Sequence, residues 1–331
     1  MKFVAFITMA AIAVTFNSCG SESGKKDVQT NSQAESHQQV LVPEFNADSA
    51  YVYIQQQVDF GPRVPNSKAH AQCADFLLSY FQKLTPHVQI QNGQVQTYDK
   101  TKINLKNIIA SFSPEKSRRI LLFAHWDTRP WADQDPTDQS KPNLGADDGG
   151  SGVGVLMEIA RHISVSEPLF GIDIILFDAE DWGKKGGGHE SEDSYCLGAQ
   201  YWVKNPHLPS YSADYGILLD LVGGKNSQFR LEGHSMNYAS FLQQKIWKTA
   251  VNIGYSDYFL FQQGGYVIDD HYYVNQAGIP SVNIIASSAT TANGFPKHWH
   301  THEDNMDVID RKTLKAVGQT VLHVIYREGS I

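Results

Sequence analysis

Apolar residues recur along this chain with two different spacings, and the two kinds of segment alternate. Short continuous apolar runs are typical of strands buried on both faces of a parallel sheet. Longer segments with apolar residues three and four positions apart are typical of helices that pack one face on a sheet. The predicted strands are 108–112, 120–124, 172–177, 217–219 and 282–285, and the predicted helices are 69–84, 153–163, 238–253 and 313–326. This alternation predicts an α/β fold, a three-layer αβα architecture with a central mixed, mostly parallel sheet.

The first residues follow another pattern. Lys2 precedes an apolar run at 3–16, which ends in Asn17-Ser18-Cys19-Gly20. A basic residue followed by an apolar run of this length predicts a signal peptide, and the run is too short to span a bilayer as a mature helix. The cysteine with its small neighbours resembles the lipobox of bacterial lipoproteins. This resemblance implies cleavage before Cys19 and lipidation of its thiol; a soluble secreted protein with an incidental cysteine is the alternative.

The domain boundaries follow from composition. Residues 20–39 are rich in Ser, Gln, Lys, Glu and Asn, so they bury too little apolar surface to offset the entropy of ordering. We therefore predict a lipoprotein signal peptide at 1–18, a flexible tether at 19–39 and a single folded domain at 40–331. The protein is expected to be an exported, membrane-anchored lipoprotein. The absence of an acidic run directly after Cys19 favours an anchor that faces the periplasm.

Composition narrows the possible partners and the role of the cysteines. With 331 residues and 41% hydrophobic composition, the chain can bury a large core. Its net charge of −8 comes without a basic cluster, which argues against nucleic acid as a partner. Two isolated cysteines carry no disulfide framework signal, so we expect Cys73 and Cys196 to be buried free thiols.

Polar residues stand where the predicted strands end. His125 follows the strand 120–124, Glu180 and Asp181 follow 172–177, and Asp220 follows 217–219. Ligands of open α/β sheets bind beyond the carboxyl ends of the strands, so these groups should meet at one rim. Asp148 joins them from a glycine-rich turn at the start of the helix 153–163.

These groups are suited to a metal. Each alone has a structural explanation, such as a helix cap for Asp148 or a turn for Asp220. Together with His300 they would repel one another unless a cation held them. Asp148, Asp181 and His300 would supply the three protein ligands of a catalytic Zn²⁺ site, and Glu180, beside a ligand, would carry protons. We therefore expect residues 40–331 to form a single zinc-dependent catalytic domain.

The order of these motifs resembles a known superfamily. The pattern is similar to the zinc aminopeptidases of the bacterial leucyl aminopeptidase type and to their relatives, the type II (animal-like) glutaminyl cyclases. The resemblance covers nearly all of residues 50–327. The motifs that carry it are His125-x-Asp127, Gly145-Ala146-Asp147-Asp148, Glu180-Asp181, Asp220 and His300-Thr301.

Local features favour the cyclase branch. His271 follows Asp269-Asp270, where the aminopeptidases usually have Ser-Asp, and Trp299 immediately precedes the ligand histidine. One departure is Asp181, since the animal cyclases have glutamate there. The resemblance implies the cyclisation of N-terminal Gln of peptides and proteins to pyroglutamate, with one zinc per chain.

The same resemblance assigns roles to individual residues. It implies that Asp220 and Asp269 share protons with Glu180 in a carboxylate network, and that His125 supports the metal site without binding the ion. Phe295 and Trp299 would wall the pocket for the glutaminyl side chain, although both could simply be core aromatics.

Two other functions remain open. A two-zinc aminopeptidase, which releases N-terminal amino acids, would find every group it needs here, including His125 and Asp220 for a second ion. A non-catalytic exported binding lipoprotein would be expected to have lost ligands or the base, and none is missing.

Overall fold

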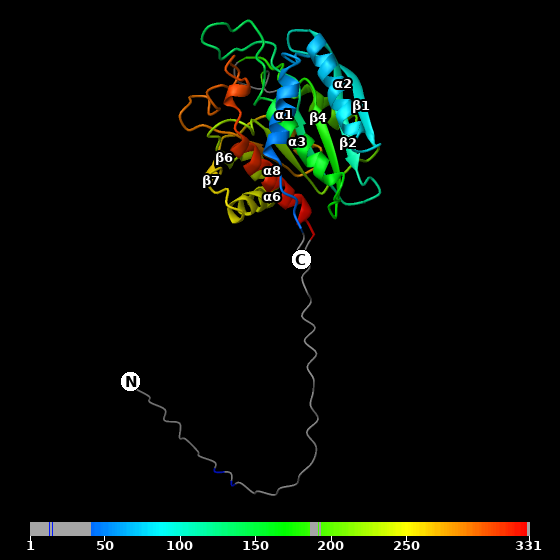
Figure 1. Ribbon diagram of the computed structural model, residues 1–331, viewed down its shortest axis with the longest axis vertical. Coiled ribbons are helices and arrows are strands. Elements are labelled where there is room, and N and C mark those ends of the chain that lie inside the picture. Colours follow the sequence, from blue (N-terminus) through cyan, green and yellow to red (C-terminus); the bar gives the residue numbers. More distant parts are fainter. Residues whose placement is uncertain (1–12, 14, 16–40, 186–190, 192, 330–331) are drawn as a thin grey trace, which may run out of the picture. The chain divides into compact units, whose positions relative to one another are not determined.

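The computed structural model describes residues 13, 15, 41–185, 191 and 193–329. Its centre is a six-stranded sheet of strand order β1-β2-β4-β3-β5-β8 (Figure 1). The strands are β1 (Val88–Gln96), β2 (Lys102–Phe112), β3 (Arg119–His125), β4 (Gly171–Phe177), β5 (Tyr215–Asp220) and β8 (Ser281–Ile285). Strands β3, β4, β5 and β8 run parallel, whereas β2 pairs antiparallel with β4 and β1 antiparallel with β2. The predicted mixed, mostly parallel sheet is confirmed.

Helices cover both faces of this sheet and complete the three layers. Figure 1 shows α1, α2, α3 and α8 lying across one face. That face is covered by α1 (Ala47–Val58), α2 (Lys68–Gln82), α3 (Gly150–Ile163), α6 (Gly233–Asn252) and α8 (Arg311–Tyr326). The other face carries α5 (Leu197–Lys204) and α7 (Asp270–Gln276). A short 3₁₀ helix, η1 (Met306–Val308), precedes α8, and β6 (Phe229–Leu231) and β7 (Phe259–Gln263) form a separate parallel pair.

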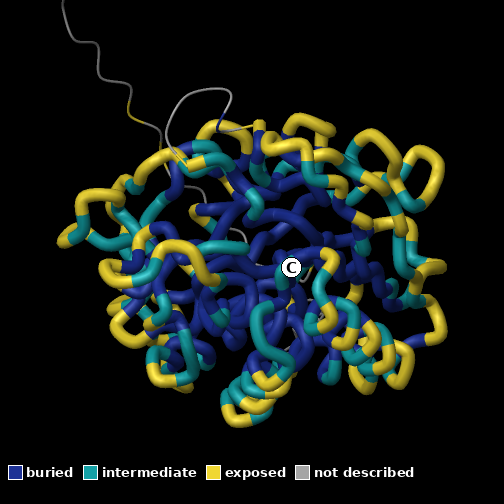
Figure 2. The backbone as a smooth tube through the Cα atoms, turned by 90° about the horizontal axis from the view of Figure 1, so that it is seen from above, coloured by how far each residue is buried: buried dark blue, intermediate teal, exposed yellow. Residues whose placement is uncertain are grey.

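The central strands are buried on both faces, as their continuous apolar runs predict. In β3, Ile120 and Leu122 join the larger hydrophobic cluster, whereas Leu121 and Phe123 join the cluster on the opposite face. Figure 2 shows the buried backbone as a dark blue interior, with the exposed backbone at the periphery. Strands with two apolar faces need a helical layer on each side, which accounts for the layered arrangement.

The sequence pattern missed several elements or predicted them only in part. The strand predicted at 108–112 is only the doubly buried end of β2, which begins at Lys102 and runs antiparallel. The edge strand β1 (VQIQNGQVQ) mixes half-buried residues with exposed Gln and Asn, so it lacks an apolar run. Helices α5 and α7 have 8 and 7 residues, too few to establish a helical period.

Some of the remaining predictions concern residues that the structure describes, and others do not. The proposed signal peptide, the tether and Cys19 lie outside the described residues, apart from positions 13 and 15. In the part that is described, no helix combines the length and the apolar character needed to cross a bilayer. Cys73 and Cys196 are buried and free, as expected.

A buried ion pair closes the end of the sheet where the parallel strands begin. Arg119 donates from Nε and Nη2 to the two carboxylate oxygens of Asp173, at 2.6 and 2.7 Å. The hydroxyl groups of Ser111 and Tyr211 donate to the same carboxylate at 2.6 and 2.8 Å. Every charged atom of the pair therefore has a partner, which is what a buried pair requires to be tolerated.

Asp173→Ala is expected to lower the free energy of unfolding by about 3–5 kcal/mol, because it leaves the Arg119 guanidinium buried without a counter-charge. Asp214→Ala is the control: it removes the partner of the exposed Arg118 and should cost at most about 1 kcal/mol. Urea unfolding of the three proteins measures both values. Equal losses in the two variants would contradict the importance of the buried pair.

Candidate metal centre and active site

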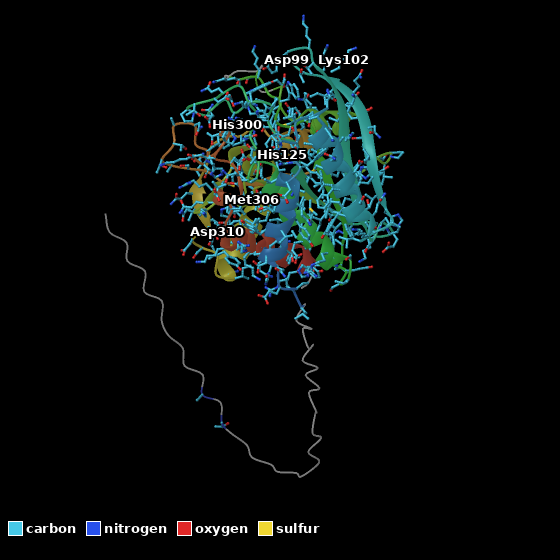
Figure 3. The ribbon with its side chains drawn as sticks, turned by 45° about the horizontal axis from the view of Figure 1, so that its top comes forward. Asp99, Lys102, His125, His300, Met306 and Asp310 are labelled. Atoms are coloured by element: carbon cyan, nitrogen blue, oxygen red, sulfur yellow. The ribbon has the colours of Figure 1, made fainter. Side chains whose placement is uncertain are left out.

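The candidate site lies at the rim where the parallel strands end. His125 is the last residue of β3 and Asp220 the last of β5, while Glu180 and Asp181 follow β4 by a short turn. Asp148 lies in the turn just before α3. Figure 3 shows His125 and His300 in the half of the domain that also carries the tip of the β1–β2 hairpin, marked by Asp99 and Lys102.

Asp148, Asp181 and His300 form the first candidate metal group. Their ligand atoms all lie within 4.8 Å of one another. Nε2 of His300 is 3.2 Å from Oδ1 of Asp181 and 3.7 Å from Oδ2 of Asp148. Oδ2 of each aspartate is buried and has no hydrogen-bond partner among the described residues. Buried polar atoms normally have partners, and two carboxylates with an imidazole are a donor set for Zn²⁺, so these residues fit the ion.

A buried arginine and a further aspartate support this group. Nδ1 of His300 lies 3.0 Å from Oδ1 of Asp133, which leaves Nε2 of the ring facing the two carboxylates. Arg129 donates to Asp133 at 2.7 Å and to Oδ1 of Asp181 at 3.4 Å. Burial opposes ionisation of Asp133, but His300 and Arg129 outweigh it and hold its pKa well below the usual range. Neither Asp133 nor Arg129 was predicted, because both lie in a loop without hydrophobic periodicity.

Two more buried carboxylates hold the backbone of the acidic segments. Asp127 accepts both amide N–H groups of the segment 180–181, at 3.0 and 3.2 Å. Asp304 accepts both amide N–H groups of the segment 147–148, at 2.7 and 3.1 Å. Each pair of acidic side chains is thus positioned by one carboxylate that faces its backbone.

A second candidate metal group shares Asp148 with the first. Nε2 of His125 lies 3.1 Å from Oδ1 of Asp148 and 3.3 Å from Oδ1 of Asp220, and the three ligand atoms are within 4.8 Å of one another. Burial lowers the pKa of His125, but the carboxylates of Asp127, Asp148 and Asp220 raise it well above the ordinary value. The carboxylates around His125 therefore favour its protonated form.

Glu180 lies between the metal group and other acids. Its Oε1 accepts a hydrogen bond from Sγ of Cys196 at 3.1 Å, and its ligand atoms lie within 4.8 Å of those of Cys196 and Asp269. Burial, with the charge of Asp269 added, raises the pKa of Glu180 well above its ordinary value. Burial also raises the pKa of Asp269, and that of Asp220 to about 8. Such shifts are what acids that share protons would have.

These residues surround a cavity of about 270 Å³. The rings of Phe295 and Trp299 stack with centroids 4.4 Å apart, and Trp299 also stacks on His300 at 3.6 Å. The cavity brings together most of the residues that the sequence singled out: Asp148, Glu180, Asp181, Asp220, Asp269, Phe295, Trp299 and His300. His125 lies behind Asp148 and is not part of the lining.

A buried glutamate accepts hydrogen bonds from a segment that lines the cavity. Glu232 accepts hydrogen bonds from the amide of Val267, which lines the cavity, and from Nε2 of His271, both at 3.0 Å. Ser235 adds two more, from its amide and its hydroxyl, at 2.7 and 2.6 Å. Burial opposes ionisation, but His271 and Ser235 outweigh it and lower the pKa of Glu232 to about 2.

Glu232→Gln is expected to reduce the loss of unfolding free energy that the protein shows as the pH falls below 4.5. Because the pKa of Glu232 is lower in the folded state than its ordinary 4.5, its ionisation stabilises the fold above pH 4.5. That contribution, roughly 2–3 kcal/mol, is lost as the pH falls toward 2. Urea midpoints of both proteins between pH 7 and pH 2 measure it. The gap between the two curves should close on acidification, and parallel curves would contradict this role.

Asp133→Ala is expected to weaken zinc binding by about 10- to 100-fold, because the ring of His300 loses the group that orients it. Competition with a chromophoric chelator measures the affinity. Asp138→Ala is a matched control, since Asp138 lies in the same loop and pairs with the exposed Lys141. If both variants bind zinc equally well, the orienting role of Asp133 is wrong.

Known proteins share this fold. Among solved structures, a Zn-dependent exopeptidase from Parabacteroides distasonis is 52% identical, with a TM-score of 0.84, over 86% of this chain and 99% of that chain. A glutaminyl cyclase from Bacteroides thetaiotaomicron is 50% identical with the same coverage and TM-score.

A curated relative is more distant. Bovine glutaminyl-peptide cyclotransferase is 26% identical over 249 residues, which are 64% of this chain. The match spans 63% of the bovine protein, less than two thirds of its length. The expected resemblance to zinc aminopeptidases and glutaminyl cyclases is confirmed. Residues 107–325 match the sequence pattern of peptidase family M28, and this chain belongs to that family.

Proposed function

We propose that this protein cyclises N-terminal glutaminyl residues of peptides and proteins to pyroglutamate and releases ammonia. The observation that carries the proposal is the cavity, in which Glu180 and the first metal group lie beside two stacked aromatic rings. Its volume of about 270 Å³ is below the range of about 300–1,000 Å³ that is usual for drug-sized ligands. The cavity therefore suits a single N-terminal residue of a peptide. Solved structures that are 50% identical to this chain carry the name glutaminyl cyclase.

Asp148, Asp181 and His300 would hold one zinc ion. The M28 family is zinc-dependent. When bound, zinc supplies Lewis-acid polarisation of the side-chain amide carbonyl of the substrate. One ion per chain is favoured because Asp220, which a second ion would need, belongs in this proposal to the carboxylate network that shares protons with Glu180 and Asp269.

The side chains of the protein account for the rest of the reaction. Phe295 and Trp299 hold the glutaminyl side chain so that its α-amine reaches the amide carbon, and closure of a five-membered ring gains from this proximity. Glu180 takes one proton from the α-amine and returns it to the departing amide nitrogen. One C–N bond forms, one breaks, and the products are a pyroglutamyl peptide and ammonia. Asp220 and Asp269 share protons with Glu180.

An aminopeptidase activity is the second candidate. The group His125, Asp148 and Asp220 has its ligand atoms within 4.8 Å, as a second zinc would require. Relatives include the aminopeptidase YwaD of Bacillus subtilis, at 27% identity over 234 residues. In this alternative, water attacks the peptide bond and a free amino acid leaves.

The location of the protein is also a proposal. Lys2, the apolar run at 3–16 and Cys19 support export and a lipid anchor at Cys19. Substrates would then be peptides or proteins at the membrane surface, on its periplasmic side. The negative net charge offers nothing to nucleic acid.

The test is the mass of a short Gln-initiated peptide after incubation with the zinc-loaded protein. Loss of about 17 Da, the ammonia expelled by ring closure, is expected, with the chain intact. Loss of the whole first residue would instead establish the aminopeptidase, and an unchanged mass would revive a binding protein.

Glu180→Gln is expected to abolish turnover, because the amide cannot carry the proton. Zinc content, measured by atomic emission, should stay as in the wild type, since Glu180 is not in the first metal group. Unchanged activity would remove Glu180 from the mechanism.

A further inference from the structure

A buried cysteine contacts the proposed proton carrier from behind the cavity. Sγ of Cys196 donates to Oε1 of Glu180 at 3.1 Å. This is the hydrogen bond that the carboxylate of Glu180 receives from the described part of the chain. Cys196 has no exposed surface and is not among the residues that line the cavity. It therefore touches the carboxylate and not the substrate.

The backbone of Cys196 is joined to the same residue. Its amide donates to the carbonyl oxygen of Glu180 at 2.8 Å, and the next amide, of Leu197, donates to the carbonyl of Ala179 at 3.0 Å. The start of α5 is thus bonded to both the main chain and the side chain of Glu180. The first bond holds the main chain of Glu180 beside α5, and the second restrains its side chain.

The strained backbone conformation of Cys196 is consistent with a functional role for its side chain. Its φ is 57°, in the left-handed region that favours glycine, and Ala179 across the two bonds has a φ of 53°. A residue with a β-carbon in this region costs about 1–3 kcal/mol, and such residues cluster at functional sites. A glycine at position 196 would avoid this cost but would leave Oε1 of Glu180 without its donor.

We infer that Cys196 is a positioning residue that occupies Oε1 of Glu180 and so reserves Oε2 for the transferred proton. This inference rests on the proposed function. The proton leaves the α-amine, resides on Oε2 and passes to the departing nitrogen, while the thiol keeps its own proton and is not oxidised. The thiol is suited to this task, because burial and the neighbouring Glu180 raise the pKa of Cys196 well above its ordinary value.

The inference is tested with three variants of the zinc-loaded protein. Cys196→Ala removes the donor and should lower kcat by about 3- to 10-fold, the effect of one weak hydrogen bond to a charged group. KM and zinc content should not change. Cys196→Ser keeps a donor and should recover part of the lost kcat. Cys73→Ala truncates the other buried thiol, in α2, and should keep the kcat of the wild type.

Other outcomes would overturn the inference. If Cys196→Ala keeps the wild-type kcat, or if it changes only KM or zinc content, Cys196 does not position the proton carrier. Should Cys196→Ala fail to fold, Cys196→Gly replaces it, because glycine adopts the positive φ without cost; its kcat should fall to the same extent. A wild-type protein that does not convert Gln-initiated peptides would defeat the proposed function instead.

Discussion

Repulsion between buried carboxylates is the constraint on which the site depends. Several acids meet at one rim of the sheet, where burial makes their negative charges costly. The protein offsets this cost in distinct ways: Arg129 and His125 supply positive charge, and backbone amides are offered to Asp127 and Asp304. Oδ2 of Asp148 and Oδ2 of Asp181 are buried and have no hydrogen-bond partner among the described residues, and a cation bound between them would satisfy both. A metal ion at this point would therefore balance charge that the protein itself leaves uncompensated.

The turns that carry these acids are strained. Ala179, Leu221 and His300 are non-glycine residues with positive φ, at 53°, 51° and 56°, and each is in or beside a segment of the site. Such conformations persist only where the surroundings impose them. Here the surroundings are the fully buried strands β3, β4 and β5, so the rigid hydrophobic layers hold the side chains of the rim in place.

Sequence alone predicted the parts of this structure that have a strong local signature. The strands with two buried faces and the long amphipathic helices could be predicted, because the spacing of their apolar residues reflects which faces are buried. The edge strand β1 and the short helix α7 were missed, since one lacks an apolar run and the other has only 7 residues. For the site, residues at strand ends could be identified, but Asp133 and the contact of Cys196 with Glu180 could not. Those two depend on loops that only the tertiary structure brings together.

Asp148 belongs to both candidate metal groups, and this sharing has an evolutionary consequence. Because Asp148 is a member of both groups, it fixes the position of the second group relative to the first. The second group can therefore bind a metal ion, or not, without any change in the first. Descendants of such a scaffold can exchange one chemistry for another through changes around His125 and the cavity wall alone. The solved structures that resemble this chain carry both names, exopeptidase and glutaminyl cyclase, as a shared metal ligand of this kind would allow.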